Sequence, residues 1–365
     1  MVRIASLLAV LSLLVGACTE GRAEDATSSE SLSEAVETTI APTTAPQAAT
    51  TTRAEPTTTP APTTTTEPPR TRLVVSATGD VNLDPTYIRE LADFGYAYPW
   101  QRLQGIFADD DLTIVNFECA VSELGSPEPK QFTFRCPPES LPDMREAGVE
   151  VANLGNNHSG DYGTDALLDS RAQLEAAGIA PVGVGANAEQ AHQPAVFEIN
   201  GWTVAVLGFG GVVPTPSWIA GEDRPGMADG DTIETMVAAV AAADEIADLV
   251  IVTIHWGVEL DTTPRAEDVE RAEAMIAAGA DAIFGHHAHR LQPLEVLDGV
   301  PVAWGLGNFV WPKLSTAGST TAVAQVVFEP DGNVRSCLVP TYIEEPGQPK
   351  LQILHDTANP CPEAG

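Results

Sequence analysis

Hydrophobic residues fall into short continuous runs between residues 73 and 328, and polar residues separate the runs. The runs are rich in β-branched residues and do not alternate, which is typical of strands that are covered on both faces. Strands are predicted on this basis at residues 73–78, 112–117, 151–154, 182–184, 203–208, 249–255, 282–284, 302–305 and 322–328.

Helical patterns lie between several of these runs. They cover residues 163–177, 231–247 and 264–278. The last of them begins with Pro264 and stops at Gly279, which is the usual asymmetry of a helix. Alternation of strands and helices over roughly 270 residues predicts a single α/β domain. We expect that domain to span residues 72–340, with residues 341–365 as a C-terminal tail.

The first residues have the pattern of an export signal. Arg3 precedes an apolar run from residue 4 to residue 15, and this run is shorter than the ~20 residues that a bilayer core requires. It ends in Val15-Gly16-Ala17-Cys18, which resembles a bacterial lipobox. Residues 1–18 are therefore predicted as a lipoprotein signal peptide with Cys18 as the lipidation site, and an ordinary signal peptide is the alternative. The lipoprotein interpretation places the protein outside the cytoplasm, anchored to the cell membrane by lipid.

The segment after Cys18 has the composition of a stalk. Between residues 39 and 69, 26 of 31 residues are Thr, Pro or Ala. Such a segment buries too little apolar surface to offset the entropy that ordering would remove. Residues 19–71 are therefore predicted to be a disordered stalk, acting as a plain spacer or carrying O-linked sugars.

Charge and cysteine content narrow the choice of partners and compartment. The chain has 51 acidic and 18 basic side chains, a formal net charge of −33, which argues against nucleic acid as a partner. The cysteines after Cys18 are even in number, as expected for disulfides in an exported chain. Of three possible connectivities we favour the two shortest loops, Cys119–Cys136 and Cys337–Cys361.

Polar side chains follow the predicted strands, where α/β folds place their chemistry. Five of the seven histidines lie in these strand-end segments. Imidazole together with carboxylate and amide oxygen suits Zn, Mn or Fe better than Ca or Mg. A metal site is predicted from the five strand-end histidines together with Asp80, Glu118 and Asn157; the histidines are His158, His255, His286, His287 and His289.

The strand-end motifs resemble those of the capsule-synthesis CapA proteins, a branch of the calcineurin-like metallophosphoesterase superfamily. The likeness runs from about residue 73 to residue 328, and the longest motifs are the most specific. The matching segments are TGDV at 78–81, NFE at 116–118, NNHSGDYG at 156–163, HWG at 255–257, GHHAH at 285–289 and GNF at 307–309. The fold that this resemblance implies is a four-layer α/β/β/α sandwich of the metallo-dependent phosphatase type.

The resemblance also implies two divalent metal ions. Asp80 and His289 resemble the ligands of one metal, and Glu118 stands where an acidic residue bridges the pair. The implied ligands of the other metal are Asn157, His255 and His287. His286 is not expected to be a ligand, because the His-x-His pair of His287 and His289 already supplies both positions.

Two positions depart from the superfamily pattern. Asn82 replaces a usual histidine ligand, and amide is a poorer ligand than imidazole, while Glu118 replaces a usual aspartate. Asn82 is retained as a candidate ligand.

Catalytic and substrate-binding roles are implied as well. His158 resembles the acid that protonates the leaving oxygen. Asp161 is either its orienting partner or the cap of the helix at Gly163. Arg135, Trp256 and Asn308 are candidates for the substrate-binding cleft, and a surface ion pair is the alternative for Arg135.

The function that the resemblance implies is a membrane-anchored metal-dependent hydrolase outside the cytoplasm. Its substrate would hold a phosphoester or γ-glutamyl bond, and it would act with the capsule-synthesis machinery on an anionic polymer such as poly-γ-glutamate. The alternatives are a non-catalytic scaffold that binds metal and polymer, and an adhesin carried on the stalk.

Overall fold

The computed structural model of the protein describes residues 68–356 and 358–361. The predicted signal peptide, Cys18 and the stalk as far as residue 67 lie outside the described residues. Within the described part of the chain, no helix has the length and apolar character needed to cross a membrane.

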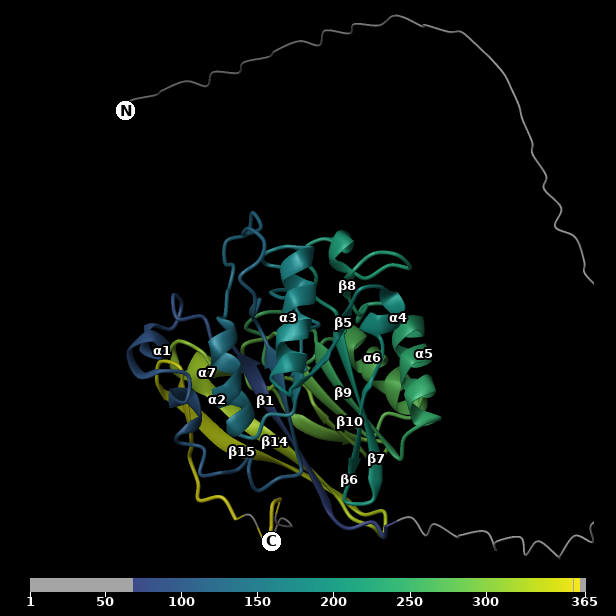
Figure 1. The fold of residues 1–365 in the computed structure, drawn as a ribbon. Coiled ribbons are helices and arrows are strands. Elements are labelled where there is room, and N and C mark those ends of the chain that lie inside the picture. Colours follow the sequence, from purple (N-terminus) through teal and green to yellow (C-terminus); the bar gives the residue numbers. More distant parts are fainter. Residues whose placement is uncertain (1–67, 357, 362–365) are drawn as a thin grey trace, which may run out of the picture. The chain divides into compact units, whose positions relative to one another are not determined.

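Two sheets form the centre of the fold (Figure 1). In the first sheet the strand order is β16-β15-β14-β1-β2-β3-β4, and β13 also pairs with β1. In the second sheet the order is β11-β12-β10-β9-β7-β6, and β5 and β8 form a separate ribbon. The strands of the first sheet are β1 (Leu73–Val81), β2 (Leu112–Phe117), β3 (Val151–Asn153), β4 (Ala180–Val182), β13 (Asn308–Val310), β14 (Thr320–Phe328), β15 (Val334–Glu345) and β16 (Gln348–Leu351). The other strands are β5 (Val184–Gly185), β6 (Ala195–Ile199), β7 (Trp202–Gly210), β8 (Gly226–Met227), β9 (Leu249–His255), β10 (Ala282–His286), β11 (Leu294–Leu297) and β12 (Val300–Ala303).

Helices cover the outer face of each sheet. Leu91, Met144 and Leu174 bring α1 (Arg89–Phe94), α2 (Leu141–Glu146) and α3 (Thr164–Ala176) into the core of the first sheet. Met236 and Met275 do the same for α5 (Ile233–Asp244) and α6 (Ala266–Ala277) on the second. The short elements are α4 (Ala188–Ala191), α7 (Thr316–Ser319), η1 (Tyr98–Trp100), η2 (Pro138–Ser140) and η3 (Pro216–Trp218).

A third apolar core lies between the two sheets. Val75 and Ile114 from the first sheet pack there with Val206 and Ile251 from the second. The layers are therefore helix, sheet, sheet, helix, which confirms the predicted α/β/β/α sandwich. The predicted strands are present except for residues 182–184, which fall on two short strands, β4 and β5, with a break at Gly183. Residues 112–117 and 249–255 form strands with those bounds.

The first sheet continues beyond the predicted domain end at residue 340. Strand β15 runs through that position and pairs with β14 and β16, so residues 341–351 belong to the sheet. Its side chains are mostly half-buried, so the sequence shows no continuous apolar run there. At the other end, the Thr71 amide donates to the Asn200 carbonyl at 2.9 Å, so contacts with the body begin before residue 72.

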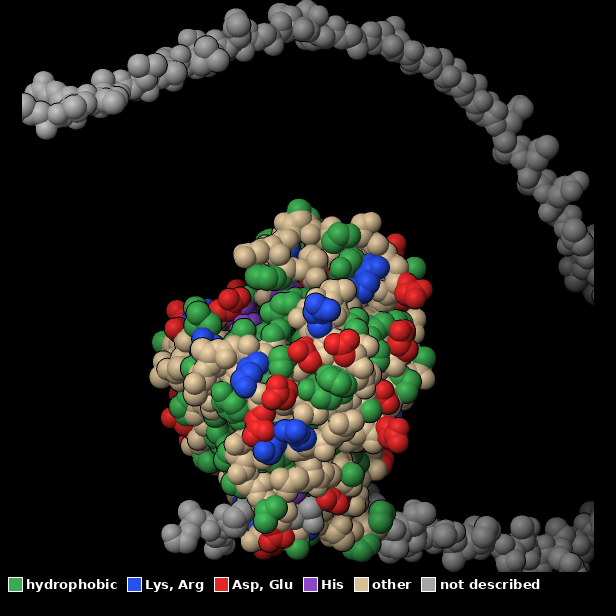
Figure 2. Space-filling view, turned by 90° about the vertical axis from the view of Figure 1, so that its left-hand side faces the viewer, with side chains coloured by type: hydrophobic (Ala, Val, Ile, Leu, Met, Phe, Trp, Pro, Cys, Tyr) green, Lys and Arg blue, Asp and Glu red, His purple; other side chains and the backbone are tan. Residues whose placement is uncertain are grey.

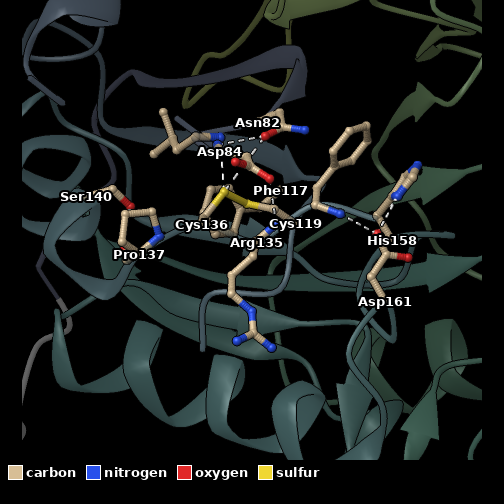
Figure 3. The surroundings of a disulfide bond; sticks show 12 residues. Asn82, Asp84, Phe117, Cys119, Arg135, Cys136, Pro137, Ser140, His158 and Asp161 are labelled. Carbon is tan, nitrogen blue, oxygen red and sulfur yellow. Dashed lines mark hydrogen bonds and ion pairs between the residues drawn. A yellow bond between two sulfur atoms is a disulfide. The ribbon is translucent and has the colours of Figure 1, made fainter. Parts of the chain in front are cut away.

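Both predicted disulfides are present, Cys119–Cys136 and Cys337–Cys361. The first joins the loop after β2 to the segment before η2, next to Asn82 (Figure 3). The second fastens the C-terminal segment to β15. Figure 2 shows that acidic, basic and hydrophobic side chains are interspersed on one face of the molecule.

The topology brings the carboxyl ends of both sheets together. Strands β1, β2 and β3 are parallel in the first sheet, and β7, β9 and β10 are parallel in the second. Two inter-sheet contacts, Glu118 with His255 and Asp80 with His286, show that these ends meet.

Candidate metal centre

The first group of candidate ligands is Asp80, Glu118 and His289, whose ligand atoms lie within 4.8 Å of one another. Asp80 is at the end of β1, Glu118 follows β2, and His289 follows β10. Asp80 Oδ2 lies 2.9 Å from His289 Nδ1, yet neither of these buried atoms has a hydrogen-bond partner among the residues that the structure describes. Glu118 Oε2 is also buried without a partner. Because buried polar atoms are nearly always paired, this arrangement fits a bound cation.

The electrostatics of this group also fit a cation. Burial raises the pKa of Glu118 well above its ordinary value, and the charge of Asp80 raises it further. Burial opposes ionisation of Asp80 too, but the contact with His289 and the charge of His286 leave its pKa lowered. Two adjacent buried carboxylates cannot both ionise without compensation. A metal ion would supply that compensation and release the proton of Glu118.

The second group is His255, His287 and Asn157. His255 Nε2 lies 3.1 Å from Asn157 Oδ1 and 3.1 Å from His287 Nδ1. Burial lowers the pKa of His255 well below its ordinary value and that of His287 to about 4. Neutral imidazoles present the lone pairs that metals bind, and tetrahedral ligands of Zn lie about 3.4 Å apart. The residues present therefore fit a second divalent ion.

The loop after β10 supplies one histidine to each group. His287 has φ 86° and His289 has φ 51°, a left-handed region in which non-glycine residues are uncommon. At Gly285 a Cβ atom would lie 2.1 Å from the Trp304 carbonyl oxygen, so only glycine fits. His286, between Gly285 and His287, is buried, and its Nε2 contacts Thr253 Oγ1 of the neighbouring strand at 2.9 Å. This ring nitrogen therefore faces the second sheet.

Asn116 links the two groups, although the sequence did not single it out as a site residue. Its Nδ2 lies 2.9 Å from Asp80 Oδ1, 2.8 Å from Glu118 Oε1 and 3.1 Å from His255 Nδ1. An amide nitrogen has two hydrogens, so it serves two of these neighbours at once. The available signal was a carboxamide near the end of the apolar run 112–117.

His158 and Asp161 form a hydrogen-bonded pair beside the two groups. His158 Nδ1 lies 2.8 Å from Asp161 Oδ2, which also accepts from the Phe134 amide at 2.8 Å (Figure 3). Lys130 forms an ion pair with the other oxygen of Asp161. Gly163 has no side-chain cap, so Asp161 contacts His158 and does not cap α3. Burial lowers the pKa of His158, and Asp161 opposes that shift.

Arg135 and Trp256 are not brought into these groups, and Asn82 is hydrogen-bonded locally. Asn82 Oδ1 accepts from the Asp84 amide at 2.8 Å, so one of the two lone pairs of that oxygen is already engaged. The Arg135 guanidinium donates to the Leu124 carbonyl at 2.6 Å, and Figure 3 shows it pointing away from His158. Trp256 is buried on the outer side of the second sheet, where it contributes to the core.

Asn308 does lie beside the first group. It pairs in register with Asp80 on the neighbouring strand, and its Nδ2 donates to the Gly318 carbonyl at 2.9 Å. Its Oδ1 is buried without a partner. Asp80 and Asn308 both raise the pKa of His289, against the lowering that burial causes.

Comparison with known proteins gives a family. The protein-family model described as bacterial capsule synthesis protein PGA_cap matches residues 74–313 of this chain. The PGA biosynthesis protein CapA of Bacillus subtilis (strain 168) is 30% identical over 276 residues, 75% of this chain and 72% of that protein. The capsule biosynthesis protein CapA of Bacillus anthracis is 30% identical over 292 residues, 76% of this chain and 69% of that protein.

Among solved structures, the Haemophilus influenzae NAD nucleotidase aligns with a TM-score of 0.45 at 13% identity, covering 75% of this chain and 50% of that one. The family match spans most of the domain and contains every candidate ligand. The chain belongs to the bacterial capsule synthesis protein PGA_cap family.

Proposed function

We propose that this protein is a metal-dependent hydrolase that acts outside the cytoplasm in the synthesis, anchoring or export of a capsule polymer such as poly-γ-glutamate. One observation carries the catalytic part of the proposal. Two groups of ligand atoms, linked by Asn116, lie next to the hydrogen-bonded pair of His158 and Asp161. Membership of the capsule synthesis family supports the polymer.

The proposed roles follow from the contacts. Asp80, Glu118 and His289 would hold one divalent ion, and a second would lie among the histidines of the other group. Bound Mn, Zn or Fe ions lower the pKa of water and neutralise charge that grows on the attacked group. Asn116 would hold the two carboxylates in place through its amide hydrogens.

His158 is the proposed proton donor. Its Nδ1 is occupied by Asp161, so Nε2 is the atom that remains to face a leaving oxygen. Asp161 fixes the ring of His158, and the Phe134 amide and Lys130 fix Asp161. General acids of this type contribute typically 10²–10⁴-fold to a rate.

Hydrolysis of bis(p-nitrophenyl) phosphate and of poly-γ-glutamate by the full chain tests this proposal. We expect Mn²⁺-dependent cleavage of at least one substrate, with His158→Ala reducing the rate at least 100-fold. His355→Ala is the control, because His355 lies near the C-terminus and outside both ligand groups. A wild-type protein that binds metal and cleaves neither substrate would contradict the hydrolase.

The anchor is a separate proposal that rests on Cys18. Labelling cells with a radioactive fatty acid should mark the wild-type protein, and Cys18→Ala should abolish the label and release the protein from the membrane. An unlabelled wild-type protein would leave the signal peptide as an ordinary one.

One observation favours a non-catalytic scaffold as the second candidate. Asn82 stands where the superfamily pattern has a histidine, and its carboxamide oxygen already accepts from the Asp84 amide, so the first group offers a weaker ligand than usual at this position. A scaffold would bind poly-γ-glutamate in a metal-dependent manner without cleaving it. Equilibrium binding and chain-length analysis of the same sample distinguish the two functions.

A further inference from the structure

Four aromatic side chains form a continuous surface beside the candidate metal centre, and we refer to it as the aromatic wall: Tyr87, Phe132, Phe134 and Trp311. The ring of Tyr87 lies 4.6 Å from that of Phe134 and 5.7 Å from that of Trp311. The rings of Phe132 and Tyr87 are 6.5 Å apart. The residues come from three separate segments, so only the fold brings them together.

The wall touches both functional parts of the centre. The Phe134 ring lies 4.4 Å from the ring of His158, the proposed acid. The Trp311 ring lies 4.9 Å from the ring of His289, a proposed ligand. A group that leaves from an atom facing His158 therefore lies next to this wall.

Part of the wall is open to solvent. Phe134 and Trp311 are each 4% exposed and form a fixed base. Phe132 is 51% exposed and Tyr87 is half-buried, so these two rings offer faces to a ligand. Stacking on exposed aromatic faces is a common way to bind flat rings.

Charge around the wall disfavours an anionic group at this place. Lys130 is engaged by Asp161 and by the Asn157 carbonyl, and the Arg135 guanidinium stacks 3.7 Å above Tyr162. In the described part of the chain, no lysine ammonium or arginine guanidinium lies within cation–π distance of the four rings of the wall.

We infer that the aromatic wall binds an uncharged ring on the leaving-group side of the substrate, and that Phe132 and Tyr87 determine this specificity. The inference rests on the proposed function for the position of the reacting bond. An aryl or sugar ring has this chemistry, whereas a run of free carboxylates does not. Of the two bonds considered for the hydrolase, the inference therefore favours a phosphoester that carries such a ring over the γ-glutamyl bond of poly-γ-glutamate.

Binding of phenylphosphonate and methylphosphonate to the Mn²⁺-loaded full chain tests the inference. The two probes carry the same charged group, so their difference isolates the ring. We expect calorimetry to give roughly tenfold tighter binding of phenylphosphonate, as one stacked ring contributes. Phe132→Ala and Tyr87→Ala should each remove most of this preference.

Phe94→Ala is the matched control, because Phe94 is 64% exposed on α1 and, within residues 68–356 and 358–361, its ring contacts Tyr98 and none of the wall. It should keep the full preference. Equal binding of the two probes, or a preference that survives both wall variants, overturns the inference even if the protein is a hydrolase. A ring preference without any hydrolysis supports the wall and contradicts the hydrolase, and binding of neither probe contradicts both.

Discussion

The side-chain nitrogen Nδ2 of Asn116 lies 2.9 Å from Asp80 Oδ1 and 2.8 Å from Glu118 Oε1. One buried donor thus stands between two buried carboxylates that come from neighbouring strands. The Asn116 side chain therefore holds the two carboxylates in place in the metal-free protein, where no cation compensates their charge.

Replacing this donor should destabilise the metal-free protein. Asn116→Leu removes both hydrogen bonds, and we expect a loss of about 2–4 kcal/mol in the free energy of unfolding in EDTA. Mn²⁺ should recover part of the loss. Urea unfolding measures both values, with the exposed Asn333→Ala as control. A variant as stable as wild type in EDTA would show that Asn116 does not support the pair.

Substitution of a ligand should lower the metal content of the protein. Asp80→Asn removes a charged oxygen from the first group and should reduce bound metal from about two ions per chain to about one. Elemental analysis of the purified full chain measures this. Asp93→Asn is the control, since Asp93 is exposed on α1. Unchanged metal content in Asp80→Asn would mean that the first group does not bind metal.

The hydrogen bond from His158 to Asp161 should affect turnover and not metal binding. Asp161→Asn keeps the shape but weakens the hold on the imidazole, so we expect kcat to fall roughly 10–100-fold. The metal content should remain that of wild type. Loss of metal together with activity would instead point to a structural role for Asp161 in positioning Asn157.

A pH dependence of stability should arise far from the centre, at Asp281. Burial raises the pKa of Asp281 to about 6, although its carboxylate accepts from the Val250 amide at 2.8 Å. The folded state therefore binds more protons than the unfolded state between pH 3.8 and about 6. Stability from this group is present at the acid side and falls as pH rises through that window.

Asp281→Asn removes the ionisable carboxyl group, and with it this pH dependence, but keeps an acceptor for the Val250 amide. The variant should be more stable than wild type by roughly 2 kcal/mol at pH 8, and equally stable at pH 4. Urea unfolding at the two pH values gives the difference. A gain that is the same at both pH values would show that the carboxyl charge is not its source.

The Cys119–Cys136 disulfide should support both stability and metal affinity. The cysteines are 17 residues apart, and a loop of this size contributes about 3 kcal/mol. The double variant Cys119→Ser, Cys136→Ser should lose that amount and bind Mn²⁺ more weakly, because Glu118 precedes Cys119. The matched control is Cys337→Ser, Cys361→Ser, which should lose stability but keep its Mn²⁺ affinity. Equal Mn²⁺ affinities of the two double variants would show that the Cys119–Cys136 disulfide does not support metal binding.

Much of the architecture follows from local patterns. Apolar runs such as residues 112–117 and 249–255 predicted their strands because strands covered on both faces cannot alternate in polarity. Strand β15 escaped prediction because its half-buried side chains leave no such run. The cysteine spacing was sufficient to favour the disulfides that form.

Local sequence patterns predicted the candidate site only in part. The sequence determined the chemistry of the strand ends, namely histidine, carboxylate and amide, and the motifs placed them in order. It did not distinguish Trp256, which packs in a core, from residues that face the centre. Nor did it show that Asn82 is bonded locally and that Asn116 is central, because both facts depend on which strands are neighbours.

The sequence by itself therefore determined the central strands of both sheets, the α/β class and the candidate ligand types, and it favoured the disulfides that form. Only the tertiary structure decided which of these side chains meet. Two sheets packed face to face bring the ends of β1, β2, β9 and β10 to one place, and the same packing assembles the aromatic wall from three distant segments. Contacts between distant segments are set by packing of the whole core, which no short stretch of sequence encodes.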